Sequence, residues 1–213
     1  MYDVIILDCD GVILDSNDLK SQIMGRTVSD YGDKLTDAFV CYHKKNGGIS
    51  RYEKFDYFLR HIANNFSEAE YSELLNRFSS LVEDALSNVP LTNGAIEFLQ
   101  KHYKRYSLFV VSGGDQTELC RVFKKRKLDK YFQGIFGSPT DKVSHCKTII
   151  KHLPHSAKIV LIGDSHLDYL AAQSCEFEFI FLSNYSEMDD WENFCSKKNI
   201  DHFPDLSSLI NNF

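Results

Sequence analysis

The sequence of 213 residues lacks the features that mark several classes of protein. Only 4 Pro and 11 Gly are present, while 43% of the residues are hydrophobic, which excludes a chain that is mainly disordered. The apolar run Val4–Leu7 is flanked by Asp3 and Asp8 and is far too short to span a bilayer. Positive charge is not in excess either, since 24 Lys and Arg face 30 Asp and Glu, a net charge of −6. Nucleic acid and membranes are therefore not expected partners.

Short metal-ligand or disulfide spacings are also missing. The six cysteines are scattered and form no CxxC pair: Cys9, Cys41, Cys120, Cys146, Cys175 and Cys195. Nor does a basic region precede the first apolar run, as it would in a secretion signal. We therefore expect a soluble protein of a reducing, cytoplasmic compartment, as a monomer or small homo-oligomer.

Short continuous apolar runs predict buried parallel strands. Five such runs are present: Val4–Leu7, Ser107–Val111, Gly134–Phe136, Ile159–Ile162 and Phe179–Leu182. Helical patterns separate most of them: Asn93–His102 with Asn93 as its cap, Gln116–Lys125, Lys142–His152, His166–Ser174, and a last helix after Pro204. This alternation predicts an open α/β fold with a parallel, Rossmann-like sheet and helices on both faces. Such sheets bind ligands beyond the carboxyl ends of their strands.

A long segment separates the first two predicted strands where one crossover helix would suffice. Residues 16–88 carry helical patterns, the clearest being a capping box at Ser67 and Glu70 that leads into an apolar face. We therefore expect an α/β core of residues 1–15 and 89–213. An all-helical domain of residues 16–88 is expected above the ligand end of the sheet.

Two acids follow the first predicted strand, in Asp8-Cys9-Asp10-Gly11. Like charges this close raise each other's pKa unless a cation lies between them, which indicates a magnesium ion or a shared proton. An ordinary Asp/Gly turn is the alternative.

The later strands end in similar polar groups. Ser112, Gly113 and Gly114 suit a nest of backbone N–H groups for phosphate oxygens, or a tight turn. Lys142 follows the third strand and offers a point charge for a phosphate, although a lone Lys is commonly a solvated surface residue.

The fourth strand ends in Gly163-Asp164-Ser165, with Asp168 further on, which alone would also fit a helix cap. The acids, the serine and glycines, and the lysine each follow a successive strand of one parallel sheet. We therefore expect all of them to converge on one crevice.

These motifs, in this order, resemble those of the haloacid dehalogenase superfamily. The inserted helices resemble its C1 caps, as in phosphoglycolate phosphatases and β-phosphoglucomutases. The residues that carry the resemblance are Asp8-x-Asp10-Gly11-Val12-x-x-Asp15-Ser16, Ser112, Lys142 and Gly163-Asp164-Ser165-x-x-Asp168. Two departures are visible: Val143 where Pro is common, and Cys175-Glu176 where a small residue and Gly are usual.

The resemblance implies a magnesium-dependent phosphatase that acts on a small phosphorylated metabolite, a phosphosugar or phosphoglycolate-like ester. By resemblance Asp8 is the nucleophile that forms an aspartyl-phosphate. Asp10, with a raised pKa, protonates the leaving group and then activates water. Mg²⁺ is expected to bind Asp8, the Asp10 carbonyl and Asp164, with Asp168 orienting a metal-bound water or Lys142. The phosphoryl group is expected to bind Ser112, the Gly113 N–H and Lys142.

Substrate choice is expected to depend on the inserted helices, because the core motifs contact only the phosphoryl group and the metal. The loop Lys44–Arg51 offers three basic side chains around a Gly-Gly turn. Arg51 and Lys45 are our candidates for binding a polar or anionic part of the substrate, and a solvated turn is the alternative.

Other functions share parts of this pattern. A sugar-phosphate mutase of the β-phosphoglucomutase type shares every core motif. A phosphonatase would need a cap lysine for a Schiff base, with Lys44, Lys45 and Lys54 as candidates by position alone. A catalytically inactive binding module usually loses a motif acid, whereas all of them are present here.

Overall fold

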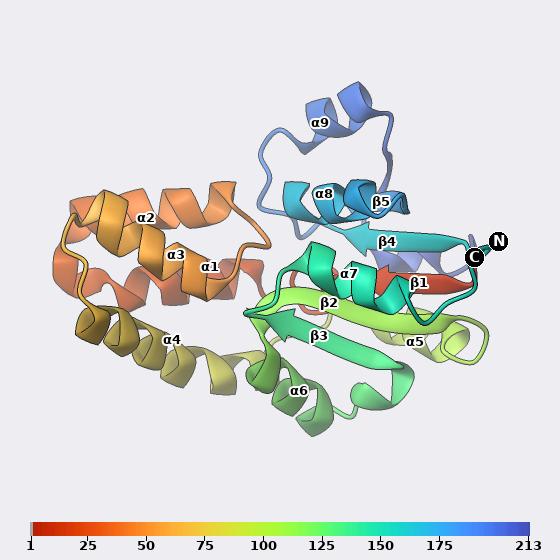
Figure 1. The fold of residues 1–213 in the computed structure, drawn as a ribbon, viewed down its shortest axis with the longest axis horizontal. Helices are drawn as coiled ribbons and strands as arrows, with labels where there is room; N and C mark the ends of the chain where they lie inside the picture. Colours follow the sequence, from red (N-terminus) through yellow and green to blue (C-terminus); the bar gives the residue numbers. More distant parts are fainter. Residues whose placement is uncertain (1) are drawn as a thin grey trace.

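The computed structural model describes residues 2–213 and, over that range, contains one sheet of six parallel strands in the order β3-β2-β1-β4-β5-β6 (Figure 1). The strands are β1 (Val4–Leu7), β2 (Ser107–Asp115), β3 (Gly134–Ser138), β4 (Ile159–Gly163), β5 (Glu178–Leu182) and β6 (Asp201–Phe203). Val4 pairs with Ser107 on one side and with Ile159 on the other. Because β2 and β4 are in register with β1, the residues that follow β1 and β4 lie at the same edge of the sheet.

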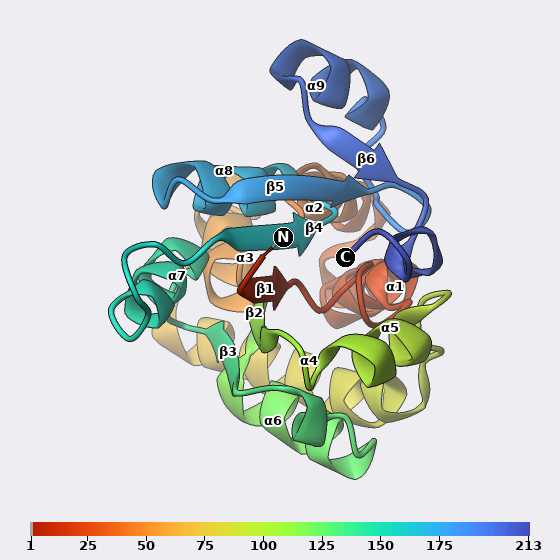
Figure 2. The same cartoon turned by 90° about the vertical axis from the view of Figure 1, so that its right-hand side faces the viewer.

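Helices cover both faces of the sheet, as the alternating pattern predicts (Figure 2). Alternate residues of β1 point to opposite faces, so Val4 and Ile6 belong to one apolar cluster and Ile5 and Leu7 to another. The first cluster includes α7 (Lys142–Ile150) and α8 (His166–Ser174). The second includes α5 (Ala95–His102) and α6 (Gln116–Lys125).

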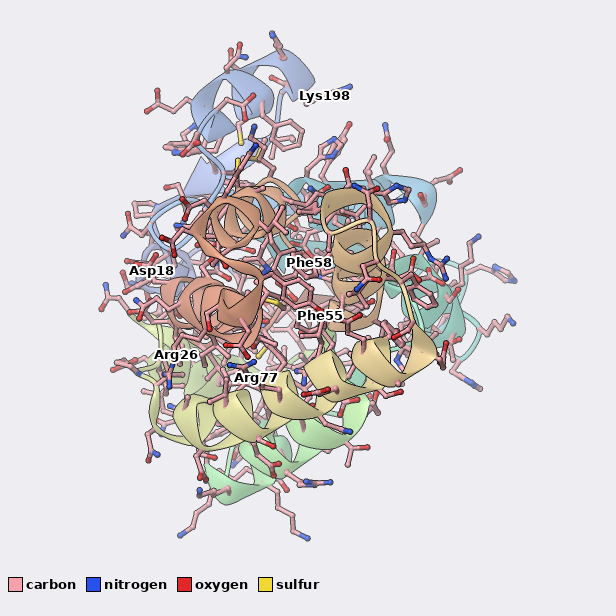
Figure 3. The ribbon with its side chains drawn as sticks, turned by 90° about the vertical axis from the view of Figure 1, so that its left-hand side faces the viewer. Asp18, Arg26, Phe55, Phe58, Arg77 and Lys198 are labelled. Atoms are coloured by element: carbon pink, nitrogen blue, oxygen red, sulfur yellow. The ribbon has the colours of Figure 1, made fainter. Side chains whose placement is uncertain are left out.

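The segment between β1 and β2 is helical and lies beyond one end of the sheet (Figure 1). Its helices are α1 (Asn17–Thr27), α2 (Asp33–Lys45), α3 (Arg51–Tyr57) and α4 (Glu68–Asn88), with a 3₁₀ turn at Ser29–Tyr31 and a π-helical turn at Phe58–Ile62. Figure 3 shows Phe55 and Phe58 pointing between these helices. Both are fully buried with Phe39 and Phe78, and this aromatic cluster joins α2, α3, the π-helical turn and α4.

The α/β fold is confirmed, and several predicted boundaries are close to the observed ones. The ranges of β1, α6 and α8 agree with those expected. The second strand is longer than expected: β2 continues to Asp115, with an irregular register against β3 after Val111. The serine and glycines of the expected turn therefore belong to the end of the strand.

Two elements near the carboxyl end were missed, β6 and α9 (Trp191–Lys198). The three residues of β6 are Asp, His and Phe, none of them fully buried, so this edge strand has no continuous apolar run. Its pairing with β5 defines it instead. The helix expected after Pro204 is only a 3₁₀ turn, Leu206–Leu209.

Two expected helix caps need correction. Gly94, with φ +77°, is the N-cap of α5, while the Asn93 side chain donates to Asp205 and Ser207. At α4, Ser67 accepts from the Glu70 N–H as expected. The Glu70 carboxylate accepts from Tyr31 Oη instead of completing the capping box. In both places, a residue from a distant segment binds the side chain that was expected to cap the helix.

The aromatic cluster predicts a large loss of stability for Phe55→Ala. Because Phe55 is fully buried, the loss of its ring and the cavity left behind should lower the free energy of unfolding by about 3–5 kcal/mol. Tyr57→Ala is the matched control on the same helix, since Tyr57 is 37% exposed and should cost about 1 kcal/mol. Denaturant titration measures both, and equal losses would show that the cluster does not stabilise the segment.

Candidate active site

A cavity of about 950 Å³ opens at the carboxyl ends of the central strands. Its walls come from the ends of β1, β2 and β4, from α1, α3 and α8, from the loop between α2 and α3, and from residues 186–191 after β5. The cavity therefore lies between the sheet and the helical segment. Its volume suits a small-molecule ligand.

Three buried carboxylates meet at this cavity, and two of them, Asp8 and Asp164, line it. Asp8, Asp164 and Asp168 each place an oxygen within 4.8 Å of the others. Burial, with the charge of neighbouring acids, raises the pKa of Asp8 to about 7 even though Lys142 opposes this shift. Burial, and then the charges of Asp8 and Asp168, raise the pKa of Asp164. Buried carboxylates at this spacing match the oxygen ligands of a hard divalent cation, which would lower both pKa values again.

Asp8 has an oxygen that is ready for such a ligand. Its Oδ1 atom is buried and accepts no hydrogen bond from residues 2–213, although Lys142 Nζ lies 2.9 Å away as an ion pair. A buried carboxylate oxygen without a hydrogen bond is costly. Of the expected metal ligands, Asp8 and Asp164 therefore fit a cation on the chemistry of their donor atoms.

Lys142 is the buried cation of the cluster. It is the first residue of α7, and its Nζ lies 2.9 Å from Asp8 Oδ1 and 2.5 Å from Asp168 Oδ1. Burial alone would lower the pKa of Lys142, but the charges of Asp168 and Asp8 raise it above its ordinary value. The side chain is therefore an ammonium, and the expected contact between Asp168 and Lys142 is present.

Asp168 serves both of the roles considered from sequence. Its second oxygen, Oδ2, accepts from the N–H and hydroxyl of Ser165, and Ser165 Oγ accepts from the Asp168 N–H. This capping box starts α8. The helix cap thus fixes the carboxylate that binds Lys142.

Asp10 has a different environment from the one expected. Ser16 Oγ donates to its Oδ1 at 2.5 Å, and Lys20 Nζ lies 2.6 Å from its Oδ2. Burial favours a raised pKa, but Lys20 and Ser16 lower the pKa of Asp10 below its ordinary value. The expectation of a raised pKa at Asp10 is therefore wrong for this arrangement, because α1 brings a lysine to it.

Two glycines are required where chain segments approach one another in the site. Gly11 has φ +73°, and a Cβ there would lie 2.2 Å from Asp164 Oδ2. A Cβ on Gly113 would lie 2.1 Å from the carbonyl oxygen of Gly48 in the helical segment. Ser112 is buried beside it and accepts from the Gly114 N–H at 3.0 Å. The expected phosphate nest therefore lies directly under the loop between α2 and α3.

The two residues expected to select substrate lie in unlike places. Lys45 is exposed at the rim of the cavity. Arg51 is buried, and its guanidinium donates to both oxygens of Glu118 on α6, at 2.6 and 2.9 Å. It also donates to Ser79 at 3.2 Å and lies over the Phe78 ring. Arg51 also lines the cavity, and because Glu118 binds its guanidinium, a contact of Arg51 with substrate stays a prediction.

Several polar residues of the cavity were missed from sequence. Asn17 donates to Asp164 Oδ2 at 2.7 Å, and Lys20, one turn later on α1, binds Asp10. Their i, i+3 spacing directly after the first motif was a usable signal. His43 was also missed; it is buried in the wall with Lys54, which the sequence offered only as a candidate lysine by position.

The chain is similar to known proteins along most of its length. Residues 5–182 match a family model described as haloacid dehalogenase-like hydrolase. A phosphorylated carbohydrates phosphatase from Thermotoga maritima is 25% identical over 193 residues, which are 84% of each chain.

Solved structures with the same fold include a predicted phosphoglycolate phosphatase from Haemophilus somnus, with a TM-score of 0.73 and 18% identity over 98% of this chain and 96% of that one. Another is YfnB from Bacillus subtilis, whose magnesium-bound form reveals interdomain movement. Its TM-score is 0.66 at 16% identity, over 93% of this chain and 99% of that one. Within residues 2–213, no helix is both long enough and apolar enough to cross a membrane.

Breaking the Arg51–Glu118 pair should destabilise the protein. Arg51→Met leaves the Glu118 carboxylate buried without its partner, which should lower the free energy of unfolding by about 3–5 kcal/mol. The double variant Arg51→Met/Glu118→Leu should recover most of that loss, because both buried charges are gone. Denaturant titration of the single and double variants measures the coupling, and strictly additive losses would contradict it.

His43 should make stability depend on pH. Burial, and then the charge of Lys54, lower the pKa of His43 to about 2, whereas an unfolded His titrates near 6.5. Below pH 6.5 the unfolded chain therefore takes up a proton that the folded chain does not, and stability falls as the pH falls.

Between pH 6.5 and 5.0 the wild type should lose about 1.5 kcal/mol more than His43→Gln. Denaturant titrations at the two pH values provide the comparison. Equal losses would mean that His43 is protonated in the folded protein.

Proposed function

The chain belongs to the haloacid dehalogenase-like hydrolases, and we propose that it is a magnesium-dependent phosphatase that hydrolyses a small phosphate monoester through an aspartyl-phosphate intermediate. The proposed substrate is a phosphosugar or a phosphoglycolate-like ester. The name of the Thermotoga maritima relative supports this class. The observation that carries the proposal is the cluster of Asp8, Asp164 and Asp168 with Lys142, beside a cavity that Asp8 and Asp164 line.

Phosphoryl transfer needs an in-line nucleophile, a proton donor for the leaving oxygen and positive charge around the phosphoryl oxygens. Asp8 is the proposed nucleophile. Asp10, two residues further on, is the proposed acid and base, while Lys142 and the Ser112–Gly113 end of β2 are proposed to hold the phosphoryl group. These residues come from three different strand ends, and the cavity brings them within reach of one small ligand.

Mg²⁺ would be held by Asp8 and Asp164, with the main-chain carbonyl of Asp10. When bound, it supplies positive charge that offsets the charge of the phosphoryl oxygens. The raised pKa values of the two carboxylates and their clustering with Asp168 within 4.8 Å support this assignment.

The proposed reaction has two steps. A carboxylate oxygen of Asp8 attacks phosphorus, the ester bond to the leaving oxygen breaks, and that oxygen takes a proton from Asp10. Asp10 then takes a proton from water, whose oxygen attacks phosphorus, and the bond to Asp8 breaks to release phosphate. Lys20 keeps Asp10 ionised, the form that the second step needs. The negative phosphoryl group beside Asp10 raises its pKa when substrate binds, which favours the protonated form for the first step.

We also propose the division into a core of residues 1–15 and 89–213 and a helical cap of residues 16–88. Asp15 and Ser16, where the chain leaves the core, lie beside its return: Leu14 pairs with Leu91, and the Asp15 N–H donates to the Pro90 carbonyl. Paired connections of this kind suit a hinge. A closed cap excludes bulk water from the cavity, apart from the water molecule that the second step uses. A cytoplasmic location and a monomeric or small oligomeric state remain expectations from the sequence.

Steady-state hydrolysis of para-nitrophenyl phosphate tests the proposed function. The wild type should be active with Mg²⁺, and chelation of the metal should abolish turnover. Asp8→Asn should lower kcat by about 10³-fold or more, because the amide is a very poor nucleophile. Asp37→Asn, a change at an exposed position of α2, is the matched control and should leave kcat unchanged.

Trapping of the intermediate separates the proposed mechanism from one in which no phosphorylated enzyme forms. Wild-type protein quenched during turnover should carry phosphate on Asp8, detected by mass spectrometry, and Asp8→Asn should carry none. Turnover that persists in Asp8→Asn would contradict the nucleophile. Turnover of a sugar phosphate to its isomer without release of phosphate would instead identify a mutase.

A further inference from the structure

Lys54 on α3 is a buried lysine that no carboxylate neutralises. Only 3% of the residue is exposed, and it lines the cavity. Its Nζ contacts His43 Nδ1 at 2.8 Å and the His43 carbonyl at 3.5 Å. Within the described part of the chain, no Asp or Glu oxygen lies within 4.0 Å of it. Lys20 and Lys142, the two buried lysines nearest the acids, both have such partners.

His43 cannot supply the missing negative charge. Because the Lys54 amino group is the donor, His43 Nδ1 is the acceptor and its N–H is on Nε2. That nitrogen faces Glu187 Oε2 at 4.0 Å, and Glu187 is bound by Ser21 at 2.6 Å and by Lys44 at 3.3 Å. His43 is therefore a neutral ring fixed between Lys54 and the loop after β5.

A buried ammonium without a counter-ion is unfavourable, and its surroundings show this. Burial, and then the charge of Lys20, lower the pKa of Lys54 to about 7, with Lys142 acting in the same direction. Glu187 and Asp10 oppose the shift without cancelling it. An anion that enters the cavity beside Lys54 would restore its charge and accept the third N–H, which His43 leaves unused.

We propose that Lys54 binds a second anionic group of the substrate, a carboxylate or a second phosphate, so that the substrate is a phosphate monoester with another negative charge. This inference rests on the proposed function, in which the phosphoryl group to be transferred binds at Asp8, another residue of the cavity wall. The remaining volume of the cavity, about 950 Å³ in total, leaves room for such a group.

Two other cations near the cavity, Arg51 and Lys45, are poorer candidates for binding the second anionic group. Arg51 is already bound to both oxygens of Glu118. Lys45 is exposed, and an anion there would gain little from a screened surface charge. Lys54 is buried, where each hydrogen bond to a charged group contributes more.

Binding of matched inhibitors tests the proposal without turnover. The probes are 3-phosphonopropionate and 3-hydroxypropylphosphonate, which differ in a carboxylate or hydroxyl at the far end. Isothermal titration with Mg²⁺ present should show that the wild type prefers the carboxylate and that Lys54→Met reduces this preference by about 10- to 100-fold. Lys54→Arg, which keeps the charge, should retain most of it. Lys34→Met, at an exposed position of α2, is the control.

Kinetics then identify the second anion. The ratio of kcat/KM for phosphoglycolate to that for 2-hydroxyethyl phosphate measures carboxylate selection. The ratio for a hexose bisphosphate to the matching hexose monophosphate measures phosphate selection. In the wild type, one of these two ratios should be well above one, and it identifies the second anion. In Lys54→Met that ratio should fall by about 10- to 100-fold, through KM more than kcat. The ratio for the anion that is not selected should stay near one in both proteins.

Defined results would overturn the proposal. One is an unchanged binding preference in Lys54→Met. Another is an equal loss of affinity for both phosphonates, or of kcat/KM for both substrates of a pair, which would indicate a structural role for Lys54. A third is covalent trapping: if borohydride reduces an imine between Lys54 and a carbonyl-bearing phosphonate, Lys54 is a nucleophile and not an anion site.

The binding test also separates this proposal from the proposed function. If the wild type hydrolyses no phosphate monoester yet prefers the carboxylate through Lys54, the proposed function fails and the anion site stands. Because Lys54→Met also removes the donor to His43 Nδ1, circular dichroism and a thermal melt at pH 7 establish that the variant folds before binding is compared.

Discussion

The ion pairs of Lys142 with Asp8 and Asp168 are the interaction on which the rest of the site depends. Three carboxylates are buried at the end of a parallel sheet, where each would be costly alone. The ammonium of Lys142 offsets part of that cost and fixes Asp8 against Asp168. Since Lys142 begins α7 and Asp168 lies in the first turn of α8, packing of these two helices determines the spacing of the charges.

The helical segment completes the site and does not only cover it. Lys20 and Asn17 of α1 bind Asp10 and Asp164, so the segment sets the protonation of a core acid. Gly48 places its carbonyl against Gly113. The Arg51–Glu118 pair ties α3 to α6 outside the reacting centre. The contacts between the helical segment and the sheet therefore fix groups on both sides of the cavity.

Much of this architecture could be predicted from sequence because it depends on local patterns. Continuous apolar runs marked five of the strands, and the polar residues that follow β1 and β4 marked the ligand edge of the sheet. The edge strand β6 could not be found in this way, since only pairing with β5 holds its polar residues. The cap of α5 was misassigned because Asn93 is bound by residues more than a hundred positions away.

The sequence by itself determined the α/β order, the inserted helices and the set of core acids with their lysine, because each is written in short motifs and periodic apolar residues. Only the tertiary structure decided the charge state and availability of individual groups. Lys20 lowers the pKa of Asp10, Glu118 binds Arg51, and Lys54 is buried without a carboxylate. These properties depend on burial and on partners from distant helices, and electrostatic energies at such sites change with every neighbouring charge.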